Sequence, residues 1–107
     1  MGAQGTGSEA RSVERRFHLS ARVSSDRPAA VRPVLDEWFP SGAVVARGDE
    51  FFVEADLTGP TAKDLNRRLL SQLRRAEKRT RLRARWVAPD GTESSFFDYV
   101  LKTVHRP

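Results

Sequence analysis

The fold is decided by residues 50–86, which read EFFVEADLTGPTAKDLNRRLLSQLRRAEKRTRLRARW. In the middle of this stretch, Thr61 and Asp64 fit the capping box that starts a helix, and Pro60 stands just before it. The apolar residues that follow fall in one narrow stripe at 100° per residue: Ala62, Leu65, Leu69, Leu73 and Ala76, with Leu70 at its margin. We therefore predict a helix over 61–78 that packs one face against the rest of the protein.

The segments on both sides of this helix are typical of strands. Residues 43–46 and 50–57 are two apolar stretches separated by the turn-forming tripeptide 47–49, which predicts a hairpin. Residues 82–88 alternate apolar side chains with arginines, the pattern of a strand with one buried face. We call the predicted hairpin, the helix over 61–78 and the strand over 82–88 the central unit.

Similar patterns extend the unit in both directions. Residues 17–23 alternate as a strand, and a short helix is expected to begin near Pro33 and to stop before Pro40. A last strand is expected over 94–104. The order βαββαββ predicts an α+β fold: a ferredoxin-like βαββαβ sandwich with an added C-terminal strand, an antiparallel sheet and two helices on one face.

The composition bounds the class of protein. A chain of 107 residues with 38% hydrophobic content has room for one domain with a packed core. We expect residues 1–15, rich in Gly, Ser and charge, to be a disordered tail before a single domain over 16–107. No apolar run could span a bilayer, and no signal peptide precedes the domain, so a cytoplasmic protein without membrane contact is expected. Arginine outnumbers lysine 16 to 3, which suggests a GC-rich bacterial genome.

The chain offers little for an enzyme. It has no cysteine, and its two histidines, His18 and His105, are far apart. No phosphate-binding glycine loop, serine nucleophile motif or HExxH helix is present, so we predict neither a metal nor a cofactor. The best acid–base pair is His18 with Glu54 or Asp56 on the open sheet face. An enzyme alternative would be a small dimer with a closed apolar pocket on that face, bordered by His18 and Phe52.

The charge is concentrated in one segment. The net charge is +5, yet residues 60–85 carry ten Lys or Arg against two acids. We predict that the helix and the following strand contact an acidic partner, and the candidate residues are Lys63, Arg67, Arg68, Arg74, Arg75, Lys78, Arg79, Arg81, Arg83 and Arg85. The leading hypothesis is a non-enzymatic binding or assembly module. A nucleic-acid-binding domain that uses the same residues is the alternative.

The alternative without a function is that the basic residues of 60–85 form a solvated surface paired with acids of the same protein. Asp64 with Arg68, and Arg74 with Glu77, have the spacing of helical ion pairs. The strand arginines could pair with Asp98 across a hairpin, or with Glu54 and Asp56 across a dimer interface.

The alternation predicts which side chains lie on the face of the sheet away from the helices: His18, Ser20, Arg22, Phe52, Glu54, Asp56, Arg81, Arg83 and Arg85. The last strand would place Phe97, Tyr99, Leu101 and Thr103 on one face and Phe96, Asp98, Val100 and Lys102 on the other. Because both of its faces would carry apolar groups, we predict a homodimer in which two sheets meet.

Overall fold

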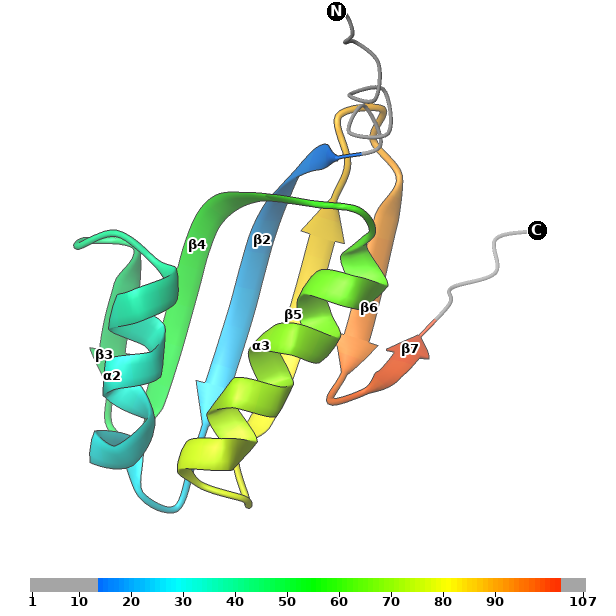
Figure 1. Ribbon diagram of the computed structural model, residues 1–107. Coiled ribbons are helices and arrows are strands. Elements are labelled where there is room, and N and C mark those ends of the chain that lie inside the picture. Colours follow the sequence, from blue (N-terminus) through cyan, green and yellow to red (C-terminus); the bar gives the residue numbers. More distant parts are fainter. Residues whose placement is uncertain (1–13, 103–107) are drawn as a thin grey trace, which may run out of the picture.

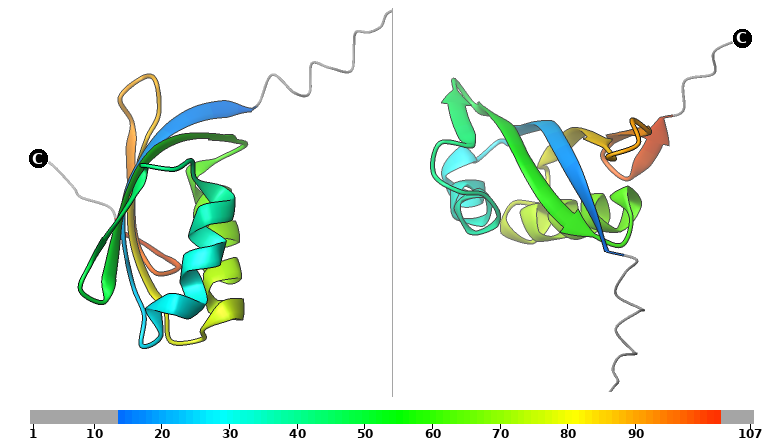
Figure 2. Two further views of the ribbon diagram at one scale, coloured as in Figure 1. Left: turned by 90° about the vertical axis from the view of Figure 1, so that its left-hand side faces the viewer. Right: turned by 90° about the horizontal axis from the view of Figure 1, so that it is seen from above.

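The computed structural model describes residues 14–102, which form an α+β domain with six strands and two helices (Figure 1). The strands are β2 (Arg15–Ser24), β3 (Val44–Arg47), β4 (Glu50–Gly59), β5 (Arg81–Val87), β6 (Glu93–Phe97) and β7 (Val100–Lys102). The helices are α2 (Pro28–Trp38) and α3 (Ala62–Ala76). The sheet order is β3-β4-β2-β5-β6-β7, and every neighbouring pair is antiparallel. Both helices lie on one side of the sheet (Figure 2).

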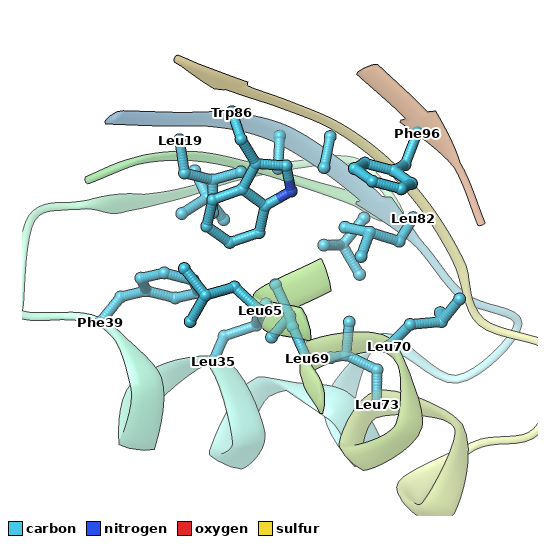
Figure 3. Packing of buried hydrophobic residues seen from close by; sticks show 14 of the residues in the cluster. Leu19, Leu35, Phe39, Leu65, Leu69, Leu70, Leu73, Leu82, Trp86 and Phe96 are labelled. Carbon is cyan, nitrogen blue, oxygen red and sulfur yellow. The ribbon is translucent and has the colours of Figure 1, made fainter. Parts of the chain in front are cut away.

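The core lies between the helices and this side of the sheet. Figure 3 shows leucines of both helices facing sheet residues, among them Leu35, Leu69, Leu70 and Leu73 opposite Leu19, Leu82 and Trp86. All seven of these side chains are fully buried. Leu70, predicted at the margin of the helical stripe, is therefore a core residue. Within residues 14–102, neither helix has the length and apolar character needed to cross a bilayer.

The predicted central unit is confirmed, with small differences at its ends. The Thr61 hydroxyl accepts a hydrogen bond from the backbone N–H of Asp64 at 3.0 Å, so α3 starts as expected. The Asp64 carboxylate does not bond to the start of the helix, as a capping box would require. It pairs with Arg67 and Arg68 in the next turn. At the other end α3 stops at Ala76, because Glu77 leaves the helix and accepts a hydrogen bond from the Ser25 hydroxyl at 2.9 Å. The predicted hairpin turns at Gly48, whose φ of 62° suits glycine.

Two element boundaries were predicted wrongly near the N-terminus. The first strand begins at Arg15, the last residue of the expected tail, while residues 1–13 lie outside the described residues. The first helix begins at Pro28 instead of near Pro33. Pro28 occupies the first helical position, where its missing N–H would have no partner in the helix. Pro33 lies inside the helix, where its missing N–H removes one helical hydrogen bond. The compensation is burial, since Val31 and Leu35 are fully enclosed on the side facing the sheet.

The predicted last strand is two strands. Strands β6 and β7 are joined by a turn at Asp98 and Tyr99, and Thr103 and Val104 lie outside the described residues. Phe96 therefore pairs with Leu101 on the helix side, whereas Phe97 and Leu101 had been expected to share a face. Strand β6 still carries apolar groups on both faces, with Phe96 on the helix side and Phe97 on the open face, but the division into two strands changes which residues share a face. The dimer itself stays a prediction.

The turn between β6 and β7 is held by a buried polar chain. Asp98 has a φ of 58°, a left-handed conformation that aspartate tolerates better than most residues. Its carbonyl accepts a hydrogen bond from the Asn66 side-chain amide at 2.9 Å, and its carboxylate Oδ1 accepts the backbone N–H of Leu82 at 2.9 Å. The oxygen of the Asn66 amide accepts the indole N–H of Trp86 at 3.2 Å. Helix α3 is thus bonded to β5 and to the turn.

Candidate functional site

The open face of the sheet is built of rows of side chains. On an antiparallel sheet, residues in register stand side by side, so a row can be followed from strand to strand. One row crosses all six strands and consists of Val45, Phe52, Arg22, Arg83, Phe97 and Val100. The next row consists of Glu54, Ser20, Arg85, Ser95 and Lys102, and the one after it of Asp56, His18, Val87 and Glu93. We call the first the aromatic row.

A shallow depression lies over the first two rows. Its volume is about 810 Å³, and its lining includes Phe52, Phe97, Arg22, Arg83 and Arg85. This volume is within the range of small-molecule sites, but the depression is open to solvent, whereas such sites usually enclose most of the ligand. The enzyme alternative expected a closed cavity bordered by His18 and Phe52. Phe52 lines the depression and His18 does not.

Cations lie against both phenyl rings of the aromatic row. The distances from cation to ring centroid are 5.6 Å for Arg22 and for Arg47 to Phe52, 4.7 Å for Arg83 to Phe97, and 5.4 Å for Lys102 to Phe97. All four are within cation–π range. Because both rings are also partly exposed, the row presents flat apolar surfaces bordered by positive charge.

The centre of the aromatic row holds two arginines side by side. Arg22 on β2 and Arg83 on β5 are register partners, a placement that is unfavourable for like charges. Arg22 is 3.6 Å from the carboxylate of Glu50. Among residues 14–102, no carboxylate lies within ion-pair distance of Arg83 or of Arg85 in the next row. The positive charge at this point of the face is therefore only partly compensated.

The acids of the open face are bonded to other side chains, although Glu54 also lines the depression. The His18 ring is bonded on both sides, with Nδ1 2.8 Å from Asp56 Oδ1 and Nε2 3.0 Å from Glu54 Oε1. The Ser20 hydroxyl donates to the other oxygen of Glu54, and Arg16 lies 3.3 Å from Asp56. These contacts satisfy both carboxylates without using Arg22, Arg83 or Arg85.

The protonation of this cluster follows from its hydrogen bonds. The bond to Asp56, and then that to Glu54, raises the pKa of His18 above its ordinary 6.5, because only an imidazolium donates on both sides. The Ser20 hydroxyl, and then His18, lowers the pKa of Glu54, while the bond to His18 is the main cause of the lowered pKa of Asp56.

The cluster does not have the geometry of a catalytic triad. Glu54 stands between Ser20 and His18, so the imidazole is not bonded to the hydroxyl that it would have to activate. Among the described residues, no group of three His, Asp or Glu side chains is arranged to hold a metal ion.

The sequence-predicted basic residues do not form one surface. Lys63, Arg67, Arg68, Arg74 and Arg75 lie on α3, on one side of the sheet, and Lys78 and Arg79 follow its end. Arg83 and Arg85 of β5 line the depression on the opposite face of the sheet, whereas Arg81, at the start of β5, lies near Arg74 and Lys78. Figure 2 shows α3 on one side of the sheet, so the sheet lies between the helix residues and the face that carries Arg83 and Arg85.

Most of the helix arginines are paired within the chain. Arg67 and Arg68 each lie 2.8 Å from Asp64, so the expected pair of Asp64 with Arg68 is confirmed. Arg74 was expected to pair with Glu77 and instead lies 3.3 Å from Asp98, because Glu77 has left the helix.

The end of α3 adds two further pairs. Arg79 is 3.3 Å from Asp26, and Arg81 is 4.0 Å from Asp98 as the hairpin alternative expected. A smaller polar depression of about 420 Å³ is lined by Asp26, Arg74, Lys78, Arg79 and Arg81.

Sequence reasoning did not name Arg22, Arg47, Lys102 or Phe97 as site residues, and it named Phe52 only at the border of an enzyme pocket. Arg22 and Phe52 were placed on the open face, but nothing in the sequence indicated that they are neighbours. Lys102 was set apart from Phe97 because the turn at Asp98 went undetected. No family model matches the chain, and no curated protein or solved structure does either.

Proposed function

We propose that this protein is a non-enzymatic nucleic-acid-binding module that holds phosphates on the open face of its sheet. The observation that carries the proposal is the register pair of Arg22 and Arg83 beside Arg85. A phosphate between these guanidinium groups relieves their repulsion, and the planar donor fork of arginine matches phosphate oxygens. The acidic partner expected from the sequence is in this view the phosphate backbone of a nucleic acid.

The placement differs from the one expected from sequence. Helix α3 is a weaker candidate, since Arg67 and Arg68 share Asp64 and Arg74 is held by Asp98. On the open face, Glu54, which lies in the row beside the aromatic row, and Asp56 would repel a phosphate, but His18 and Arg16 offset their charge. The open face therefore supports anion binding better than the helix does.

We further propose that the fold is ferredoxin-like. The order β3-β4-β2-β5 of the first four strands in the chain, with a helix after the first and after the third, supports this assignment. The hairpin of β6 and β7 then extends the sheet at the edge of β5.

A homodimer is the competing occupant of the open face. Val45 and Val100 at the two ends of the aromatic row are 49% and 62% exposed, and a second copy could cover them. Sedimentation velocity at micromolar protein separates the two cases. A monomer that binds nucleic acid agrees with the proposal, and a dimer whose nucleic-acid binding is unaffected by charge reversal on the open face contradicts it.

The first test is fluorescence anisotropy with labelled RNA and DNA at several salt concentrations. Binding should weaken on a log–log plot with a slope of about −0.7 to −0.9 per phosphate contacted. The double variant Arg83→Glu/Arg85→Glu should reduce affinity at least tenfold. The matched control Lys63→Glu/Arg75→Glu makes the same change of charge on α3 and should retain more affinity.

Two results would overturn the proposal. One is the absence of nucleic-acid binding at low salt. The other is a loss of affinity in Lys63→Glu/Arg75→Glu that equals or exceeds the loss of affinity in Arg83→Glu/Arg85→Glu. Circular dichroism of both variants checks that they remain folded.

A further inference from the structure

The two partly exposed phenyl rings of the aromatic row are separated by a defined distance. Phe52 is on β4 and Phe97 is on β6, with β2 and β5 between them. Three strand spacings of about 4.8 Å place the two backbone positions about 14 Å apart. That distance is about four 3.4 Å steps of a stacked strand, which join about five nucleotides, and fewer if the strand is extended.

The order of groups along the row matches a nucleic-acid strand. From β4 to β6 the row reads ring, guanidinium, guanidinium, ring, with Phe52, Arg22, Arg83 and Phe97 in register. A single strand that crosses the sheet in this direction offers base, phosphate, phosphate and base in the same order. Aromatic rings are stacking platforms that accept any base, and arginines between them hold the backbone.

We infer that the nucleic acid is single-stranded and crosses the sheet along the aromatic row, with one base stacked on Phe52, another on Phe97 and the linking phosphates on Arg22 and Arg83. This inference rests on the proposed function and adds the class of nucleic acid, its path and the two stacking residues.

A duplex does not fit the same face. The bases of a duplex are stacked on one another, so their flat sides cannot reach Phe52 or Phe97. Reading a duplex in its major groove needs a helix or a two-stranded ribbon that inserts into it. The open face is a broad sheet with a shallow depression, and both helices lie on its other side (Figure 2). A duplex could therefore contact the arginines but not the rings.

The experiment compares labelled oligothymidylates of one to ten nucleotides with a ten-base-pair duplex at one low salt concentration. The variants are Phe52→Leu, Phe97→Leu and their combination, which keep an apolar side chain but remove the ring. Leu101→Ala is the matched control, because it truncates an exposed apolar residue that shares the helix side of the sheet with Phe96.

We expect affinity to rise sharply once the oligonucleotide spans both rings, at about three nucleotides for an extended strand and about five for a stacked one. Each Phe→Leu substitution should weaken the binding of the longer strands by roughly 5- to 150-fold, and the double variant by about the product of the two effects. Leu101→Ala, on the other face of the sheet, should change affinity less than about twofold. Photocrosslinking with 5-iodouracil-substituted strands should label Phe52 and Phe97.

The possible failures are distinct. Single-strand binding that is unchanged in both Phe→Leu variants, or duplex binding as tight as single-strand binding, overturns this inference and leaves the proposed function in place. Binding of neither nucleic acid overturns the proposed function, and this inference with it. Thermal unfolding of each variant confirms that the lost affinity is not lost structure.

Discussion

Substitutions at Asp98 should separate three contributions of one side chain to stability. The carboxylate accepts a hydrogen bond from the backbone N–H of Leu82. In a regular β-ladder the Asp98 carbonyl would accept this bond, but that carbonyl accepts from the Asn66 side chain instead. The second carboxylate oxygen lies 3.3 Å from Arg74, and the side chains of this ion pair are only 20% and 31% exposed. The third contribution is the backbone, which is left-handed at this residue with a φ of 58°.

The expected magnitudes differ among three variants. Asp98→Ala leaves the buried N–H of Leu82 unpaired, which costs about 1–3 kcal/mol. It also removes the ion pair with Arg74, at about 0–1 kcal/mol, and holds alanine in a left-handed conformation at about 1 kcal/mol. We expect a loss of about 3 kcal/mol in the free energy of unfolding, or roughly 12–24 °C in Tm for a domain of this size.

Two further variants isolate the parts. Asp98→Gly should cost about 1 kcal/mol less than Asp98→Ala, because glycine adopts this backbone freely. Asp98→Asn should cost about 1 kcal/mol or less, since the amide keeps an acceptor oxygen and asparagine tolerates a positive φ.

The assay is urea denaturation followed by tryptophan fluorescence, with Tm from circular dichroism. The reasoning would be refuted if Asn were as damaging as Ala, because the hydrogen bond would then not matter. It would also be refuted if Gly were as damaging as Ala, because the backbone would then carry no cost. A loss below about 1 kcal/mol in the alanine variant would show that Leu82 finds another partner.

The remaining predictions concern other parts of the fold. Asn66→Ala leaves the indole N–H of Trp86 without its partner, and we expect a loss of about 2–4 kcal/mol in urea denaturation. Gly59→Ala would place a Cβ 2.7 Å from the Leu65 side chain, so Tm should fall by an amount equivalent to about 1–3 kcal/mol. Because the pKa of His18 is raised by folding, its contribution to stability is fully present below about pH 6.5 and is lost as pH rises through the folded-state pKa. Thermal melts across that pH range should show a Tm that declines with pH in the wild type but not in His18→Gln. An equal slope of Tm against pH in the two proteins would contradict the assigned hydrogen bonds.

The faces of the elements could be predicted from the sequence because a side-chain period is local. The alternation of β2 assigned Phe17 to the core and His18 to the open face, and the structure agrees. The helical stripe likewise assigned Leu69 and Leu73 to the core. A period of two residues or of 3.6 residues needs no knowledge of what the element packs against.

Pairing across strands could not be predicted in the same way. Whether Arg22 stands beside Arg83 depends on the register of β2 against β5, which is set by the whole core and not by either strand alone. The turn at Asp98 carries no glycine or proline, and its aspartate adopts a positive φ through contacts with residues 16 and 32 positions away. The aromatic row depends on both features, which is why sequence reasoning named Arg83 as a candidate without its neighbours Arg22 and Phe97.

The adjacent arginines of β2 and β5 favour the proposed phosphate binding but lower the stability of the sheet. Two guanidinium groups in register weaken the sheet, and a threonine at either position would form a better cross-strand neighbour. A laboratory selection that rewards only resistance to heat should therefore replace Arg22 or Arg83 early. A selection that rewards ligand retention should keep both and gather its stabilising changes on the helix side. The residues that emerge at these two positions would record which pressure the protein had been under.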